Sequence, residues 1–176
     1  IVVAVPRFFE KMYDKIMSGI KQTSDTKQKL FNWALKIGKD YTNLSHANHS
    51  IPFVLKIKHK IADKIIYSKV RDKLGGKIKF FISGGAPLPQ KIAEFFSGIG
   101  ITILEGYGLT ETSPVLTSNT PKKIRFGTVG VKLDNVDLKI ADDGEILAKG
   151  PNIMLGYYNN EAATNDVFDE EGWFHT

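Results

Sequence analysis

Two short apolar runs, each followed by a glycine-rich loop, constrain the fold of this chain more than any other feature. The runs are Ile78–Ile82 and Ile101–Leu104, and a helical pattern that opens at Pro89 and continues through Phe96 separates them. Short runs of this kind between glycines are typical of strands that are buried on both faces. A strand, a helix and a second strand at this spacing predict a parallel α/β layer.

The residues before the first run show helical periodicity. Apolar side chains recur at helical spacing over Phe9–Ile20, and Pro6 suits a first helical turn. Ser24 is a suitable N-cap for a second helix, which we expect to end at Gly38. The polar stretch Tyr41–Ser50 then predicts a loop.

A long basic helix is expected next. Val54–Leu74 carries apolar residues at helical spacing, and its isoleucine face is expected to pack inside the domain. The surrounding stretch Ile51–Phe80 holds eight lysines and one arginine against two aspartates, a net charge of +7. No aromatic residues alternate with the lysines and no nucleic-acid-binding motif is present, so a nucleic-acid partner is not indicated. A solvated polar face and contact with an anionic membrane surface both remain open.

The second part of the chain follows a different pattern. Apolar and polar residues alternate over Val136–Ile140, and Glu145–Lys149 follows after the turn Asp142–Gly144, which predicts a β-hairpin. We therefore expect an α/β protein with a partial α/β subdomain, residues 1–118, followed by a truncated β-rich subdomain, residues 119–176.

Two loops that follow the predicted strands carry the residues best suited to a ligand. Ser83–Pro89 contains two glycines, which let a flat ligand approach the backbone closely. Glu105–Ser113 combines the ring of Tyr107, the hydroxyl of Thr110 and the carboxylate of Glu111, a set that suits a nucleotide with Mg²⁺. From composition alone, a tight strand-to-helix turn and a polar loop with one buried tyrosine remain open alternatives.

The same loops carry a resemblance to a known family. Tyr107–Glu111 resembles the Tyr-Gly-x-Thr-Glu signature of the adenylate-forming, AMP-binding superfamily of acyl-CoA synthetases, luciferases and peptide-synthetase adenylation domains. The other family blocks that match, in the same order, are Ser83–Pro89, Gly127–Gly130, Gly144–Gly150 with Gly156–Tyr158, and Gly172–Thr176. The N-terminal run Val5–Tyr13 resembles a segment typical of long-chain fatty acyl-CoA synthetases, which luciferases and peptide synthetases usually lack.

The resemblance implies a long-chain fatty acid–CoA ligase whose β-rich subdomain is a distorted barrel. Such a ligase joins a fatty carboxylate to the α-phosphate of ATP, which gives acyl-AMP and pyrophosphate, and coenzyme A thiol then displaces AMP. The implied partners are fatty acid, ATP and coenzyme A, with Mg²⁺ as the metal. The alternatives are a ligase for a medium-chain or aryl acid and a non-catalytic acyl- or nucleotide-binding module.

The resemblance also implies roles for residues of the two loops. Thr110 would bond the α-phosphate and Glu111 would bind Mg²⁺, so these two are the expected catalytic residues. Tyr107 would stack on adenine, and Glu105 would accept a hydrogen bond from its amino group. Gly108 would lie beside the acyl carbonyl. The residues expected to bind the nucleotide are Gly84, Gly85, Ala86, Pro87, Glu105, Gly106, Tyr107, Gly108 and Thr110.

Other parts of the family pattern lie outside these 176 residues. They are the phosphate loop, the ribose-binding aspartate and the C-terminal domain with its lysine, so we expect a central piece of a synthetase that is inactive alone. The four histidines do not show metal-site spacing, and the absence of cysteine excludes a thiolate site and fits a reducing compartment. We expect a cytoplasmic protein with peripheral contact to a membrane.

Overall fold

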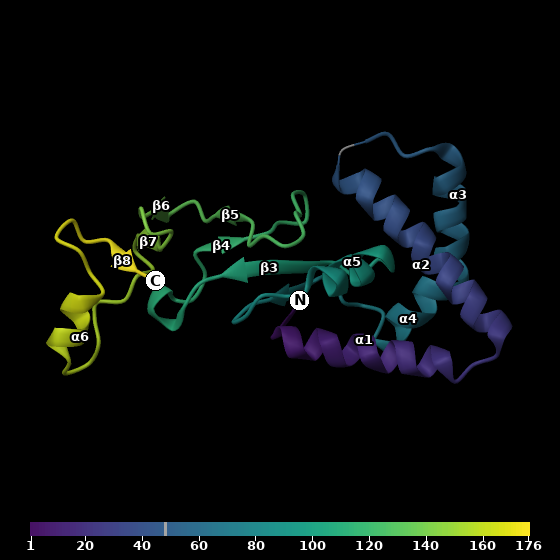
Figure 1. Ribbon diagram of the computed structural model, residues 1–176, viewed down its shortest axis with the longest axis horizontal. Helices are drawn as coiled ribbons and strands as arrows, with labels where there is room; N and C mark the ends of the chain where they lie inside the picture. Colours follow the sequence, from purple (N-terminus) through teal and green to yellow (C-terminus); the bar gives the residue numbers. More distant parts are fainter. Residues whose placement is uncertain (48) are drawn as a thin grey trace.

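A five-stranded sheet runs through the middle of the molecule. The computed structural model describes residues 1–47 and 49–176, and the strand order is β1-β2-β3-β4-β5 (Figure 1). The strands are β1 (Val2–Ala4), β2 (Phe81–Ser83), β3 (Ile103–Tyr107), β4 (Thr117–Ser118) and β5 (Val131–Lys132). The first three are parallel, and β4 and β5 are antiparallel to their neighbours. The predicted parallel layer is confirmed, while β1 is an element that the sequence pattern did not indicate.

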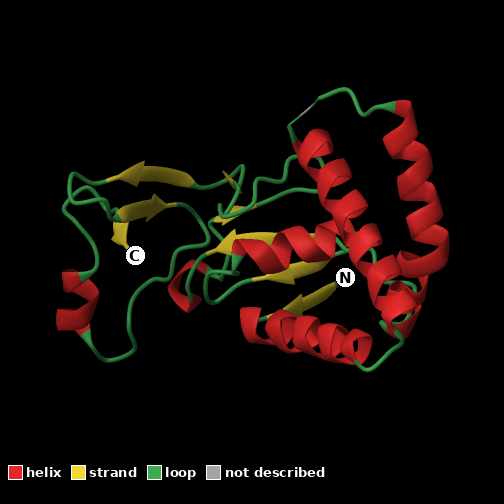
Figure 2. Ribbon diagram, turned by 45° about the vertical axis from the view of Figure 1, so that its right-hand side comes forward, coloured by secondary structure: helices red, strands yellow, loops and turns green. Residues whose placement is uncertain are grey.

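Helices gather at one end of the sheet (Figure 2). They are α1 (Pro6–Lys21), α2 (Asp25–His46), α3 (Phe53–Ala62), α4 (Ser68–Lys73) and α5 (Gln90–Gly98). The core forms where α1 and α5 pack on the parallel strands. There the ring of Phe9 lies 5.5 Å from Phe81 and 6.2 Å from Phe96, in both cases edge to face. Aromatic pairs in this geometry stabilise a core beyond the area that they bury.

The predicted end of the second helix at Gly38 is wrong, because α2 continues to His46. Gly38 instead permits a close helix crossing: a Cβ there would lie 2.1 Å from the carbonyl oxygen of Gly98 in α5. The expected loop Tyr41–Ser50 is therefore helical as far as His46. Asn48, which belongs to the same expected loop, lies outside the described residues.

The long basic helix is confirmed as three consecutive segments, α3, the π-helical turn η1 (Asp63–Tyr67) and α4. Tyr67 holds it against α2, because its buried hydroxyl donates to the carbonyl oxygen of Ala34 at 2.5 Å. Burial raises the pKa of Tyr67 to about 12. The expectation that the isoleucine face packs inside is wrong for Ile57, Ile61 and Ile65, which are exposed.

A second, three-stranded sheet follows towards the C-terminus. It consists of β6 (Asp137–Ile140), β7 (Ile146–Lys149) and β8 (Phe174–His175), and every pairing is antiparallel. The predicted hairpin is β6–β7, and the short helix α6 (Glu161–Asp166) lies between β7 and β8 in the chain. Within the described residues this sheet is open, so the expected distorted barrel is not closed here. The division after residue 118 stays a prediction.

No helix in the described ranges 1–47 and 49–176 combines the length and apolar character that crossing a bilayer requires.

We predict that Gly38→Ala destabilises the fold although alanine is the better helix former. The added Cβ would meet the backbone of Gly98, and overpacking of this kind lowers the free energy of unfolding by about 1–3 kcal/mol. Gly19→Ala in α1 is the matched control, since its Cβ would meet nothing within 4 Å. That variant should gain about 0.5–1 kcal/mol. Urea unfolding measures the free energy of unfolding of both variants. Equal stabilities of the two would contradict the close crossing of α2 and α5 at Gly38.

Candidate functional site

A cavity of ≈ 480 Å³ lies where β2 and β3 end. Three segments form its wall: the loop after β2, the end of β3 and the chain before β5. The lining residues are Ser83, Gly85, Ala86, Pro87, Leu88, Glu105, Gly106, Tyr107, Gly108, Gly127 and Val129. Ligands of open α/β sheets bind beyond the carboxyl ends of the strands, so this cavity is the candidate site.

Seven of the nine residues expected to bind a nucleotide line this cavity, and Gly84 and Thr110 do not. Gly84 is absent from the lining, and Thr110 and Glu111 lie on the neighbouring 3₁₀ turn η2 (Thr110–Thr112). Gly127 and Val129 are lining residues to which sequence reasoning gave no role. The sequence did offer a signal for these two residues, because both belong to the block Gly127–Gly130, which resembles a conserved block of the family.

Glu105 is the buried charge of the site. Its residue is 8% exposed and lies on β3. Burial raises the pKa of the Glu105 carboxyl, while the backbone N–H groups of Leu88 and Gly127 act in the opposite direction by hydrogen bonding to it. The carboxyl group therefore lies among all three segments of the cavity wall.

The turn η2 is fixed by one buried hydroxyl. Oγ1 of Thr112 accepts a hydrogen bond from the backbone N–H of Leu109 at 2.9 Å and lies 2.8 Å from the carbonyl oxygen of Pro114. The side-chain amide of Asn152 donates to the carbonyl of Thr112 at 2.7 Å. The chain also passes close to itself here, since a Cβ on Gly108 would lie 1.7 Å from the Pro114 carbonyl oxygen. Glycine at this position thus has a packing reason independent of any ligand.

Glu111 presents a carboxylate from this fixed turn. Its Oε1 accepts a hydrogen bond from the hydroxyl of Tyr157 at 3.0 Å, and this contact raises the pKa of Tyr157. In the described part of the chain, no three His, Asp or Glu side chains gather as metal ligands. A single carboxylate fits Mg²⁺, which keeps several waters and takes other ligands from substrate phosphates. It does not fit an ion held by protein ligands alone.

Tyr107 connects the cavity to the C-terminal strand. Its hydroxyl oxygen lies 2.7 Å from Oγ1 of Thr176, the residue that follows β8. The ring lines the cavity at the same time. One side chain therefore contacts both the candidate site and the second sheet.

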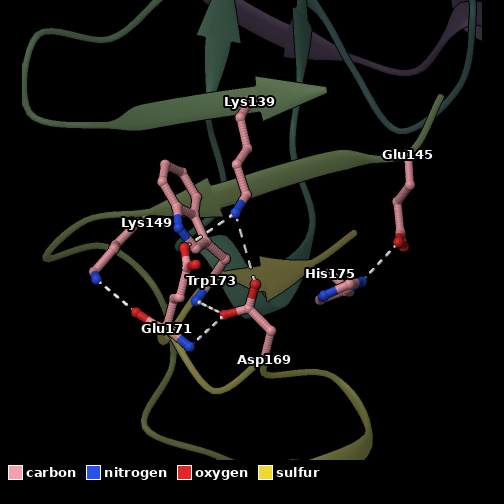
Figure 3. A network of polar contacts seen from close by, with 7 residues as sticks. All are labelled: Lys139, Glu145, Lys149, Asp169, Glu171, Trp173 and His175. Carbon is pink, nitrogen blue, oxygen red and sulfur yellow. Dashed lines mark hydrogen bonds and ion pairs between the residues drawn. The ribbon is translucent and has the colours of Figure 1, made fainter. Parts of the chain in front are cut away.

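A polar network holds β8 in the position that this contact requires (Figure 3). Asp169 accepts a hydrogen bond from the backbone N–H of Trp173 at 2.8 Å, and its pKa is lowered mainly by that bond. The ammonium of Lys139 lies 4.5 Å from the centre of the Trp173 ring. Nδ1 of His175 lies 2.7 Å from a carboxylate oxygen of Glu145. These contacts hold Trp173, directly before β8, and His175, at its end.

The sequence matches the family model described as AMP-binding enzyme over residues 1–158. The chain belongs to the AMP-binding enzyme family. The chain is 38% identical over 176 residues to the long-chain-fatty-acid–CoA ligase FadD15 of Mycobacterium bovis, covering 100% of this chain and 29% of that protein. It is 32% identical over 188 residues to the peroxisomal long chain acyl-CoA synthetase 6 of Arabidopsis thaliana, covering 98% of this chain and 25% of that protein.

Solved structures agree with this assignment. A malonyl-CoA ligase complex with methylmalonyl-CoA and AMP bound aligns with 61% of this chain and 25% of that chain, at 36% identity and a TM-score of 0.53. The resemblance seen in the sequence is confirmed at the level of the family and its α/β fold. The chain spans less than a third of the length of the relatives named here.

We predict that Glu105→Gln changes how the stability of this chain depends on pH. The folded carboxyl keeps its proton to a higher pH than the unfolded one, whose ordinary pKa is 4.5. The free energy of unfolding of the wild type therefore falls as pH rises from that value through the raised pKa. The neutral amide has no such loss, so the variant should be more stable relative to wild type at about pH 7 than at about pH 4.

Urea unfolding at both pH values measures this difference. Glu170→Gln removes an exposed carboxylate and is the matched control, for which we expect no comparable change. A wild-type pH dependence that survives in Glu105→Gln would contradict the role of Glu105 as the buried charge.

Proposed function

We propose that this chain forms the adenylate-binding part of a long-chain fatty acid–CoA ligase. The observation that carries the proposal is the cavity in which the loop after β2 and the end of β3 meet beside the turn with Glu111. The family model is described as AMP-binding, and relatives at 38% and 32% identity are named as long-chain fatty-acid or acyl-CoA ligases. Because those relatives are much longer, the activity proposed here belongs to the full-length protein.

The proposed reaction has two steps. A fatty carboxylate attacks the α-phosphorus of ATP, the bond to pyrophosphate breaks, and acyl-AMP forms. The thiol of coenzyme A then attacks the acyl carbon, loses its proton and displaces AMP. In the first step negative charge moves on the phosphate oxygens, so donors and cations that are already in place stabilise the transition state most.

Thr110 and Glu111 are the residues that we propose serve the phosphates. Thr110 is exposed at the start of η2, so its hydroxyl is available as a donor to the α-phosphate. Glu111 would hold Mg²⁺, which when bound supplies the positive charge that neutralises the phosphate oxygens. The buried hydroxyl of Thr112 keeps both residues on one rigid turn, which lowers the cost of arranging them for the reaction.

The cavity suits adenine in particular. Tyr107 offers an aromatic face, and the backbone of Gly85 and Ala86 with Pro87 forms part of the opposite loop. A Glu105 carboxylate accepts hydrogen bonds and cannot donate one, so it favours a base that presents an amino group over one that presents a carbonyl at that position. Adenine presents such an amino group on its six-membered ring.

We predict that Glu111→Gln in the full-length protein lowers ATP–pyrophosphate exchange on the order of 10²-fold, because an amide is a much poorer ligand of Mg²⁺ than a carboxylate. The Mg²⁺ concentration needed for half-maximal exchange should rise as well. Glu161→Gln is the matched control, since it removes an exposed carboxylate on α6. An unchanged exchange rate in Glu111→Gln would refute the metal assignment.

We predict that Tyr107→Ala weakens ATP binding by roughly 1–3 kcal/mol, the usual value of one aromatic stacking contact with a base. Tyr107→Phe keeps the ring and loses only the contact with Thr176, so its ATP affinity should stay near that of the wild type. Titration calorimetry measures the affinities, and a panel of fatty acids measures chain-length preference. A shift in that preference with unchanged ATP affinity would place Tyr107 in the acyl site instead.

A further inference from the structure

The outer side of α3 and η1 carries two parallel rows of side chains. Residues four apart lie on the same side of a helix, which makes each row continuous. The apolar row is Phe53, Ile57, Ile61 and Ile65, with exposed fractions of 76%, 45%, 46% and 37%. The lysine row is Lys56, Lys60 and Lys64, each of them exposed and each directly before an isoleucine of the apolar row. A folded chain thus presents a continuous apolar line beside a line of positive charge.

The π turn keeps this apolar row straight. In a regular α-helix a row of residues four apart drifts by about 40° per step, because one turn holds 3.6 residues. The turns of η1 are wider, since their hydrogen bonds join residues five apart. Four residues complete less than a full turn in such a segment, and the step from Ile61 to Ile65 runs partly through η1, so the drift is smaller there. The row from Phe53 to Ile65 therefore stays on one side for about 18 Å.

The opposite side of the same helix is anchored to the rest of the protein. The ring of His59 stacks on Tyr41 of α2 with 4.0 Å between the ring centres, and Tyr67 donates to Ala34. In Figure 2 α3 lies at the outer edge of the helical end, beyond α2. The apolar row and the lysine row therefore face away from the packed interior.

The charge of the lysine row is not compensated within the described residues. No ion pair joins Lys56, Lys60 or Lys64 to an acid there. Asp63, the acid nearest to the row in sequence, binds Arg71 at 2.6 Å. Lysines beside an apolar line can lay their methylene chains along it and extend their ammonium groups to phosphates.

We propose that the apolar row and the lysine row dock α3 on the surface of a bilayer that contains anionic lipid. The helix lies in the plane of the surface, with the apolar row at the boundary of the acyl chains and the lysine row among the head-group phosphates. A second copy of the chain on this face would bring lysines against lysines, whereas a phosphate surface complements them. Docking needs neither ATP nor an intact active site, so it is independent of the function proposed above.

The first test is co-sedimentation of the full-length protein with vesicles of phosphatidylcholine, with and without phosphatidylglycerol. We expect binding to the anionic vesicles only, and loss of that binding at high salt. Replacing the lysine row, Lys56→Gln, Lys60→Gln and Lys64→Gln together, should weaken binding roughly fivefold per lysine, on the order of a hundredfold in all. The matched control removes the same charge from exposed lysines on other elements: Lys11→Gln, Lys122→Gln and Lys123→Gln. The control should bind within a few-fold of the wild type.

The second test keeps the charge and removes the apolar row. Ile57→Ser with Ile61→Ser should weaken binding to the anionic vesicles at least tenfold while the free energy of unfolding stays close to that of the wild type, because both side chains are already exposed. Loss of binding without loss of stability supports insertion of the apolar row.

Several results would overturn the proposal. Equal binding to neutral and anionic vesicles, or equal losses in the lysine-row variant and its control, would exclude specific docking through this face. If the wild type did not bind vesicles and the double serine variant were destabilised, the apolar row would be assigned to an internal contact of the full-length chain. A change from dimer to monomer in that variant, seen by analytical ultracentrifugation, would assign the row to a second copy.

Discussion

The parallel pairing of β2 with both of its neighbours is the contact on which the remaining structure depends. Phe81 of β2 stands opposite Val2 on one side and Ile103 on the other, so the backbone of β2 is paired along both of its edges. Because the strands are parallel, the loops that follow them emerge at one edge of the sheet. The candidate site exists because this pairing brings Gly85 and Tyr107 to the same cavity although they are distant in sequence.

The sequence predicted the features that local patterns encode. Both central strands, the helix between them and the hairpin β6–β7 follow directly from the spacing of apolar residues and turn glycines. The loops of the cavity were identified too, since parallel strands place their following loops together. The block Gly127–Gly130 was recognised as well, but spacing does not indicate that the antiparallel return before β5 brings Gly127 and Val129 to the cavity.

The errors share a physical origin in tertiary contacts. A glycine such as Gly38 often ends a helix. Here it lies inside α2, where the close approach of Gly98 leaves no room for a side chain. The π turn was not predicted, because a single wider turn of five residues leaves the amino-acid composition of the helix unchanged. Tyr157 meets Glu111 across a separation of 46 residues, and such pairs are set by the fold and not by spacing.

The contact between Tyr107 and Thr176 has a consequence for how the two sheets respond to a ligand. A ligand that orders the ring of Tyr107 also favours the position of Thr176, the residue that follows β8, because the two hydroxyls share one hydrogen bond. Thermodynamic linkage makes the effect mutual. A change that displaces the strand lowers the binding free energy of the ligand by the same amount. His175 lies on β8, and Glu145 directly precedes β7. Their pairing therefore contributes to the same equilibrium. The Tyr107 hydroxyl thus links a ligand in the cavity to the position of the residue that follows β8.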